Sequence, residues 1–435
     1  MQALDYHVGW IAALPLEGAA ALDMLDEEHE PIQQAAQDDN NYFLGRIGPH
    51  NVVITILPYM GSVPAAVVAA QMRSTFPSLR FVLLVGIGGG APTAIHDIRL
   101  GDVVVSRPVG QYSGVIQYDF GKTLHEGRFK ITGSLNRPSA VLLTATSSLE
   151  ARHRRSGHSQ INAILEDVIQ GNSNREEACH PPFNGVDELF ESSYRHPNDN
   201  NRTCDECDRR NLVVTRPLRS TSQPRIHYGL IASANQVMRD ALTRDRLSAE
   251  LDVLCFEMEA AGLMNYFECL VIRGICDYSD SHKNKQWQEY AAATSAAYAK
   301  ELLITIPPTS SIQANMADRP HGSGMAQSFQ VNQMQSSHTA QFASHHFNSM
   351  YPHAKRISRD AAESGKYVRI LGCLLLTGHI SLSQVTVVYR NGRSSRKYRT
   401  CCRRNLFLAA GTSRVSSLGC SETCATLDSW KAWSW

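Results

Sequence analysis

The feature that most constrains the fold is a series of continuous apolar runs that alternate with helical patterns. Such runs lie at 6–14, 51–58, 81–90 and 101–106, and segments such as 64–76 between them have a helical pattern. Runs rich in β-branched residues, without regular polar alternation, suit strands that are buried on both faces. Their alternation with helices predicts an α/β fold built on a sheet with many parallel strands.

A second set of the same patterns occupies residues 226–305, which indicates two halves of one domain separated by an insert. The insert, at about 155–225, is polar and turn-rich, and we expect it to cover the sheet as a helix and an irregular loop. The composition changes again after the second half of the domain ends, near residue 308. We predict a catalytic domain at 1–308, and a low-complexity, disordered tail at 309–435 that lacks the apolar density to pack. An altered reading frame is an alternative origin for the tail.

The charge balance argues against two classes of partner. The chain has 42 Lys and Arg residues against 41 Asp and Glu residues, so it has no basic excess for nucleic acid or for an anionic membrane surface. No apolar run approaches the roughly 18 residues of a membrane-spanning helix. The N-terminus also lacks the pattern of a secretory signal. We therefore expect a cytoplasmic protein that binds neither nucleic acid nor membrane.

Cysteine usage favours reduced thiols. Several of the eleven cysteines, such as Cys255 and Cys276, lie within apolar runs, which is typical of buried thiols rather than of a disulfide framework. Cys204 and Cys207 form a CxxC pair in a polar loop, with His196 upstream. One pair is half of a zinc site at most. A structural metal and a solvated loop are both open interpretations, and our expectation is that no metal is bound.

The glycine-rich segment GIGGGA, at 86–91, meets the letter of a dinucleotide-binding motif. Pro92 and the residues after it do not open a helix that could hold a pyrophosphate, and the motif follows an inner strand rather than the first one. A dinucleotide site is therefore not favoured. Gly86 and Gly88 would instead let backbone amides approach a small ligand at the carboxyl end of a strand.

Three acidic residues follow apolar runs. Glu17, Glu259 and Asp277 would converge on one edge of a parallel sheet. Each alone has a structural interpretation: an acid in the first turn of a helix, a strand cap, or an ion pair with Arg273. Together they suit a reaction with a cationic transition state, in which one acid protonates a leaving group and another orients a nucleophile. Cleavage of a glycosidic bond is the natural candidate.

Four ordered segments resemble one known family: VGWIAALPLE, VLLVGIGGGAP, CFEMEAAGLMN and VIRGICDYSD. The family is that of nucleoside phosphorylases and nucleosidases, which includes purine nucleoside phosphorylases, uridine phosphorylases and methylthioadenosine/S-adenosylhomocysteine nucleosidases. QYDFGKT and CDYSDSHKNKQWQEYAAA are similar to its branch at the N-terminus of fungal NLR-like proteins. The resemblance covers about residues 5–305. It implies a three-layer α/β/α fold with a central mixed, largely parallel sheet, a purine nucleoside or nucleotide substrate, no cofactor, and a homo-oligomer.

The resemblance also implies roles for individual residues. Asp277 would donate a proton to purine N7, and Glu17 would position the attacking water. Glu259 would bind the sugar 2′- and 3′-hydroxyls, with Met258 packed against the sugar, whereas Glu257 would be structural. The base and the nucleoside would be contacted by Val237, Met238 and Trp287.

The nucleophile depends on whether a phosphate site exists. Phosphorylases of the family carry an arginine and a serine where this chain has Leu84 and Ile87, since an anionic nucleophile needs guanidinium groups. Hydrolysis is therefore predicted, with phosphorolysis or a non-catalytic nucleoside-sensing module of an NLR-type protein as alternatives. Lys122, Lys283 and Lys285 would bind a 5′-phosphate chain or belong to the solvated surface.

Overall fold

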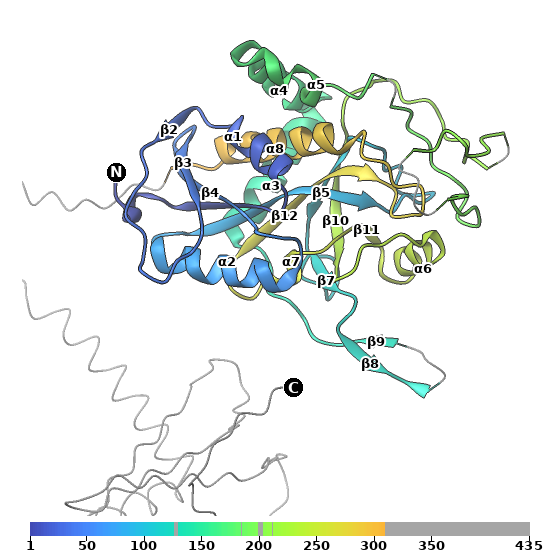
Figure 1. Ribbon diagram of the computed structural model, residues 1–435, viewed down its shortest axis with the longest axis horizontal. Coiled ribbons are helices and arrows are strands. Elements are labelled where there is room, and N and C mark those ends of the chain that lie inside the picture. The colour runs from blue at the N-terminus through green and yellow to red at the C-terminus, as the bar shows by residue number, and fades with distance from the viewer. Residues whose placement is uncertain (126–128, 184, 199–202, 211, 309–435) are drawn as a thin grey trace, which may run out of the picture. The chain divides into compact units, whose positions relative to one another are not determined.

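The structure is a computed structural model, and it describes residues 1–308 apart from a few short gaps. The gaps are at 126–128, 184, 199–202 and 211. The tail predicted at 309–435 lies outside the described residues. Within them, helices cover both faces of a central β-sheet (Figure 1), which confirms the three-layer α/β/α fold expected from the sequence.

The apolar runs of the sequence form the strands of one mixed sheet. In the described part of the chain the strands lie in the order β11, β10, β6, β12, β5, β1, β4, β3 and β2, and β7 pairs with β10 outside this order. β8 and β9 form a separate hairpin. The strands are β1 (Val8–Ala12), β2 (Glu27–His29), β3 (Tyr42–Ile47), β4 (His50–Ile56), β5 (Phe81–Gly90), β6 (Val103–Ser106), β7 (Val115–Gln117), β8 (Gly121–Thr123), β9 (Phe129–Ile131), β10 (Ile226–Ser233), β11 (Val253–Glu257) and β12 (Cys269–Asp277).

Several neighbouring strands are antiparallel, including β12 with β6, β3 with β4 and β2 with β3, and one further antiparallel pairing changes the expected arrangement of the site. β1 is parallel to β4 and β5, and β5 is parallel to β12, so β1, β5 and β12 end at the same edge. β11, in contrast, pairs antiparallel with the end of β5, through Cys255 with Gly90 and Phe256 with Gly89. Because β11 also pairs with β10, the sheet closes on itself at this point. The end of β11 therefore reaches β5 from the opposite direction, not from the shared edge that the sequence suggested.

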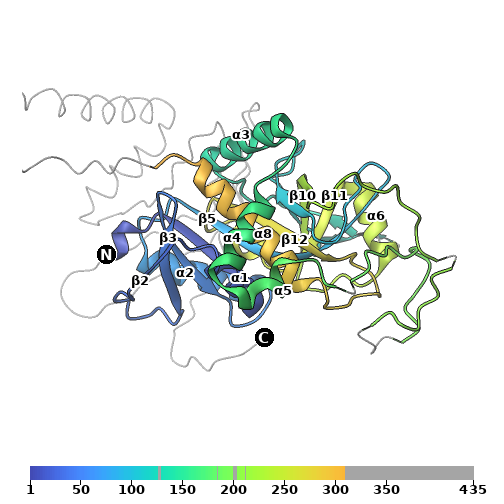
Figure 2. The ribbon, with the colours of Figure 1, turned by 90° about the horizontal axis from the view of Figure 1, so that it is seen from above.

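Two groups of helices cover the two faces of the sheet (Figures 1 and 2). One buried cluster joins α1, α3, α4, α5 and α8 to one face, and another joins α2 and α7 to the opposite face. α6 packs beside β10 and β11. The helices are α1 (Pro15–Leu22), α2 (Ser62–Thr75), α3 (Ala140–Ser156), α4 (Ile161–Gly171), α5 (Glu176–Cys179), α6 (Ala241–Leu251), α7 (Ala260–Leu263) and α8 (Gln288–Thr305), with 3₁₀ turns at Ala3–Asp5 and Ser173–Arg175. None of these described helices combines the length and the hydropathy that crossing a bilayer requires.

The alanine-rich segment of the sequence is α8, which lies against the centre of the sheet. Most of its residues are buried, since it packs on β12 and β5 and is covered by α1, α3, α4 and α5. Gly274 of β12 makes this close approach possible, because a Cβ at that position would overlap the backbone of Ala291. Small residues on α8 and β12 thus allow the helix to lie close to the strand that ends in Asp277.

The polar segment at 155–225 begins with helix and continues as an irregular loop. α4 and α5 pack on α8. From 180 to 225 the described residues form no helix or strand apart from an isolated bridge between Phe190 and Val213. Backbone hydrogen bonds, such as that from the amide of Glu191 to the carbonyl of Leu212, and side-chain contacts with the rest of the fold hold this loop.

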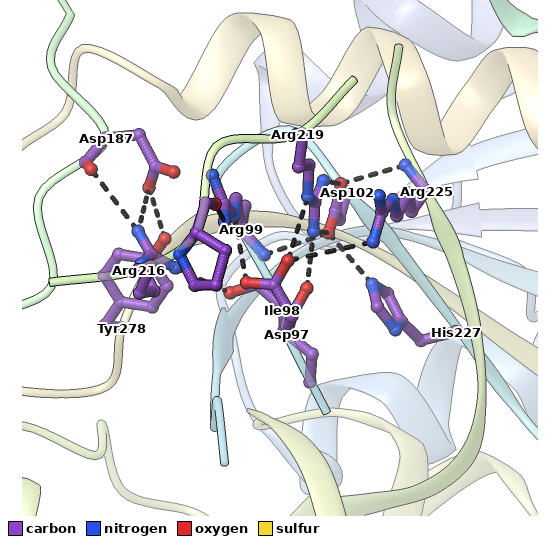
Figure 3. A network of polar contacts seen from close by, with 11 residues as sticks. Asp97, Ile98, Arg99, Asp102, Asp187, Arg216, Arg219, Arg225, His227 and Tyr278 are labelled. Atoms are coloured by element: carbon purple, nitrogen blue, oxygen red, sulfur yellow. Dashed lines mark hydrogen bonds and ion pairs between the residues drawn. The ribbon is translucent and has the colours of Figure 1, made fainter. Parts of the chain in front are cut away.

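A buried carboxylate anchors the end of the loop (Figure 3). Asp102, just before β6, is only 1% exposed, and Arg219 donates to both of its oxygens, at 2.7 Å each. His227 Nε2 lies 2.9 Å from the same carboxylate, and the amide of Arg225 donates to it. Burial raises the pKa of Asp102, but the hydrogen bonds and charges of Arg219 and His227 outweigh burial and hold it below its ordinary value. The charged anchor fixes the loop to the sheet.

A second arginine joins the loop to the segment that follows β12 (Figure 3). Arg216 donates to the carbonyl of Ile98 at 3.1 Å and forms an ion pair with Asp187 at 2.9 Å. Its guanidinium also lies over the ring of Tyr278, 5.1 Å from the centroid. The loop is thus attached to the residue that directly follows Asp277.

Candidate functional site

One buried guanidinium organises three carboxylates. Arg273 lies in the middle of β12 and is fully buried. Its Nη2 donates to Glu257 at 2.5 Å and to Glu259 at 3.1 Å, and its Nη1 lies 3.9 Å from the carboxylate of Glu17. A buried carboxylate group is tolerated only when it is paired or hydrogen-bonded. Arg273 therefore allows acidic side chains from three separate elements to lie together inside the fold.

Glu17 is held by backbone amides at the start of α1. Pro15 opens the helix, and the carboxylate of Glu17 reaches back to accept hydrogen bonds from the amides of Ala13 at 2.6 Å and Leu14 at 2.9 Å, in the manner of a capping acid. Its other oxygen accepts from the amide of Ile87 in β5 at 2.8 Å. Burial raises the pKa of Glu17, and the opposing effects of Arg273 and the amides do not cancel it. This raised pKa suits a group that exchanges a proton with bound water.

The two glutamates of the EME segment at residues 257–259, Glu257 and Glu259, have different surroundings. Glu257 ends β11, binds Arg273, and accepts hydrogen bonds from the amides of Glu259 and Ala260. Glu259 accepts from the amide of Gly61 at 3.2 Å. Burial raises the pKa of Glu259 to about 7, against the charge of Arg273 and with the help of the nearby Glu257 and Glu17 carboxylates. Glu257 is thus fully occupied by the protein, whereas Glu259 keeps acceptor capacity for a ligand.

Asp277 forms an ion pair at the end of β12. Lys283 Nζ donates to its Oδ1 at 2.5 Å, and the amide of Ser279 donates to the same oxygen at 2.8 Å. The thiol of Cys276 lies 3.3 Å from Oδ2. Burial raises the pKa of Asp277, but the charge and hydrogen bond of Lys283 outweigh it, so the pKa is lower than that of an ordinary aspartate. The ligand-free carboxyl group is therefore ionised at neutral pH.

Most of the residues singled out from the sequence line one cleft. These are Glu17, Gly88, Val237, Met238, Met258, Glu259 and Asp277. Gly86 and Trp287 lie outside this lining. Gly86 faces Arg273 in the strand pairing, behind the carboxylate of Glu17. Trp287 packs in the core against Tyr290, with ring centroids 6.1 Å apart, and it is the next residue, Gln288, that reaches the cleft.

The structure adds two residues whose importance the sequence reasoning did not identify. Arg273 was considered only as a partner for Asp277, whereas it binds the two EME glutamates. Lys283 was considered for a phosphate chain, whereas it binds Asp277. An arginine within an apolar strand is a usable signal, because a buried guanidinium requires acidic partners. Of the other lysines considered, Lys122 lies in the β8–β9 hairpin and Lys285 is exposed.

The fold and the cleft define an α/β protein of the class that binds a small ligand where central strands end. The family model of the phosphorylase superfamily matches residues 7–304 of the chain. The chain therefore belongs to the phosphorylase superfamily.

The chain is also similar to individual proteins. A nucleotide-binding leucine-rich repeat (NLR)-like protein of Hyaloscypha variabilis is 48% identical over 305 residues, which are 70% of this chain and 30% of that protein. A 5′-methylthioadenosine/S-adenosylhomocysteine nucleosidase of Mycobacterium bovis is 23% identical over 311 residues, which are 69% of this chain and 96% of that protein. A solved structure of futalosine hydrolase from Helicobacter pylori, 16% identical, covers 69% of this chain and 97% of its own, with a TM-score of 0.44. The chain thus spans less than a third of the NLR-like relative.

Proposed function

We propose that the chain hydrolyses the N-glycosidic bond of a purine nucleoside or nucleotide. The observation that carries the proposal is the presence of Glu17, Glu259 and Asp277 in one cleft. Membership of the phosphorylase superfamily and the similarity to a nucleosidase support it. The transition state of glycosidic cleavage carries positive charge on the sugar, and carboxylates close to the ring stabilise that charge.

Each acid has a distinct proposed role. Asp277 protonates N7 of the purine, which makes the base a neutral leaving group. Glu17, whose pKa is raised by burial, orients the attacking water and accepts its proton. Glu259 accepts hydrogen bonds from the sugar hydroxyls. Met258 packs against the sugar, and Val237 and Met238 frame the base.

The ion pair of Asp277 adds a step to this scheme. Lys283 keeps Asp277 ionised in the ligand-free chain, so Asp277 must gain a proton before it can donate one. We propose that the incoming substrate separates Lys283 from Asp277, because an unpaired carboxylate beside a buried base takes up a proton more readily. Substrate binding and activation of the acid are thereby coupled.

Water is the proposed nucleophile because the cleft offers little for a phosphate ion. Lys283 is the one basic side chain among the described residues that line it, and it is already bound to Asp277. Leu84, at the position of a phosphorylase arginine, is fully buried. Phosphate binding normally uses guanidinium forks that reach the ligand. The guanidinium of Arg273 is bound to Glu257 and Glu259.

The test is an assay of base release by the full chain. Adenosine, inosine, methylthioadenosine, AMP and ATP are each incubated with and without phosphate, and free base is followed by chromatography. Base release at the same rate in both conditions supports hydrolysis and identifies the substrate. Release that requires phosphate contradicts the assignment of water as nucleophile.

A nucleoside-sensing module without turnover is the second candidate. The ionised state of Asp277 in the ligand-free chain favours it, as does the similarity to an NLR-like protein. Calorimetry with adenosine separates the two functions. Saturable binding without any base released over hours would support sensing and would contradict hydrolysis.

The affinity for nucleoside is expected to increase with pH through about 7. Burial raises the pKa of Glu259 to about 7, and only its ionised form accepts hydrogen bonds from both sugar hydroxyls. Below that pH the affinity should fall by up to about tenfold per pH unit. The measurement is the Kd of adenosine in the Asp277→Asn variant, in which turnover is slow. Glu259→Gln should bind weakly with no such pH dependence, and an unchanged pH dependence in that variant would contradict the assignment to Glu259.

Gly86→Ala is expected to lower kcat/KM by about 10²-fold, the cost of displacing a catalytic group by about 1 Å. The new methyl group would overlap the carboxylate of Glu17 and lie 2.7 Å from Arg273 Nη1. Gly171→Ala is the matched control, because nothing lies within 4 Å of the position of its added methyl group. Base release by both variants is compared. Full activity of Gly86→Ala would mean that the position of Glu17 does not matter for the reaction.

A further inference from the structure

Three potential metal ligands of the loop at 180–225 lie together. The ligand atoms of His196, Cys204 and Cys207 are all within 4.8 Å of one another. His196 and Cys207 are buried, and Cys204 is half-buried. The two cysteines have the C-x₂-C spacing that many zinc sites use, and the structure supplies the histidine that the sequence alone could not place beside them.

A fourth residue, His282, is close to this cluster and makes no hydrogen bond through its ring, although a carboxylate oxygen of Asp280 lies 3.9 Å from its Nδ1. His282 is only 7% exposed, and neither nitrogen of its ring has a hydrogen-bond partner. The ring centroids of His282 and His196 are 5.4 Å apart, and the thiol of Cys204 lies 3.8 Å from the carbonyl oxygen of His282. The ring is stacked on Phe190, with 4.0 Å between centroids, and this contact uses the face of the ring rather than the in-plane lone pairs of its nitrogens. A buried imidazole without hydrogen bonds costs folding free energy unless a ligand binds it.

We propose that Cys204, Cys207, His196 and His282 bind one structural Zn²⁺ ion. Two thiolates and two imidazoles form a donor set that zinc prefers, and a closed set of four protein ligands is typical of structural rather than catalytic zinc. Tetrahedral bonds of about 2.0–2.3 Å place ligand atoms roughly 3.3–3.8 Å apart. For His196, Cys204 and Cys207, whose ligand atoms are already within 4.8 Å of one another, this requires shifts of about an ångström. The ring of His282 would also have to turn towards them.

The surroundings of His196 fit this role. Its Nε2 lies 3.0 Å from the carbonyl oxygen of Thr203, which is the backbone acceptor that a metal-bound histidine commonly uses for its second nitrogen. Its Nδ1 is then the ligand nitrogen. The ion would take the place of the hydrogen bond that the amide of Asn198 donates to Nδ1, with 3.1 Å between the two nitrogens.

The proposed ion would join the loop to the segment after β12. His196 and the two cysteines belong to the loop, whereas His282 lies next to Lys283, the partner of Asp277. The amide of His196 already donates to the side chain of Ser281 at 2.9 Å. The ion would therefore help to position the segment that carries Lys283. The proposal rests on the ligand cluster alone and does not depend on the proposed reaction.

The first test measures zinc directly. The full chain is purified without a chelator or a metal-affinity tag, and zinc is quantified by mass spectrometry. We expect about one zinc per chain, and near zero in a Cys204→Ser, Cys207→Ser double variant. His282→Gln should weaken zinc binding by more than the roughly 10–100-fold that loss of an outer partner costs. Cys179→Ser, which removes a buried thiol elsewhere, should keep its zinc.

A second measurement identifies the ligands. Replacement of zinc by Co²⁺ should give the intense visible bands of a tetrahedral ion and the ultraviolet charge-transfer bands of cobalt thiolate. Four results would overturn the proposal: a wild-type chain that binds no zinc even after zinc is added, a disulfide between Cys204 and Cys207, zinc that persists in the double variant, or unchanged affinity in His282→Gln. None of these readouts involves base release, so failure of the metal proposal and failure of the proposed function are distinguishable.

Discussion

Asp277→Asn is expected to slow base release by about 10²–10⁴-fold, the usual effect of losing a general acid. Asparagine keeps the size of the side chain and its contact with the amide of Ser279, but it cannot transfer a proton to purine N7. The variant also leaves Lys283 without its carboxylate partner, so some loss of stability is expected, limited by the 22% exposure of the Lys283 side chain. The measurement is kcat for base release by the full chain, with thermal unfolding of both proteins alongside.

Lys283→Met is the matched variant for this experiment. It keeps the carboxyl group of Asp277 and removes the ammonium group that lowers its pKa. The limb of the pH–rate profile that belongs to Asp277 should therefore move to higher pH, while base release continues. Full activity of Asp277→Asn would remove Asp277 from the mechanism. Loss of activity in Lys283→Met as large as that in Asp277→Asn would instead assign the proton transfer to the pair.

Arg273→Met is expected to destabilise the chain by about 3–5 kcal/mol, the range found when one partner of a buried ion pair is removed. The variant leaves Glu17, Glu257 and Glu259 buried without their cation, although methionine fills most of the space. Arg46→Met is the control. It breaks an ion pair with Glu27 in which both side chains are about half exposed, and it should cost no more than about 1 kcal/mol. Denaturant unfolding measures both free energies.

The penalty of Arg273→Met should also depend on pH. Burial already raises the pKa values of Glu17 and Glu259, and Arg273 opposes the increase. Without Arg273 these pKa values rise further, so a folded chain above neutral pH must bury charged carboxylates or take up protons. A group whose folded pKa is raised loses stability as the pH increases past its unfolded pKa. The penalty should therefore be larger at about pH 8 than at about pH 5, and equal penalties would contradict the role given to Arg273.

The fold could be predicted from the sequence because burial on both faces leaves a local signal. The runs that became β1 and β5 contain no charged residue, and β12 has only Arg273 before its final Asp277. The alternation of these runs with helices predicts the layers. The antiparallel pairing of β11 with Gly89 and Gly90 had no such signal. It depends on how far the ten-residue strand β5 extends beyond its neighbours, which is a property of the assembled sheet.

For the candidate site, the acids could be predicted from the sequence but their ion-pair partners could not. Acids that follow apolar strands are visible in the sequence, and Glu17, Glu259 and Asp277 do line one cleft. The ion-pair partners of these acids cannot be predicted from the sequence, because a long basic side chain can reach any of several neighbouring acids. Arg273 binds Glu257 of the EME segment. Asp277, which the sequence reasoning had paired with Arg273, is instead bound to Lys283.

The interleaved strand order also has a consequence for synthesis on the ribosome. β5 is complete at Gly90, but its neighbour β12 begins only at Cys269. The two neighbours of β6, β10 and β12, are likewise synthesised after β6 itself. At about 5–20 residues per second, roughly 10–40 s pass before the missing strands emerge. During that time the nascent chain exposes unpaired strand edges, which are sites of aggregation. Soluble yield of this protein should therefore respond to translation speed and to chaperones that bind nascent chains.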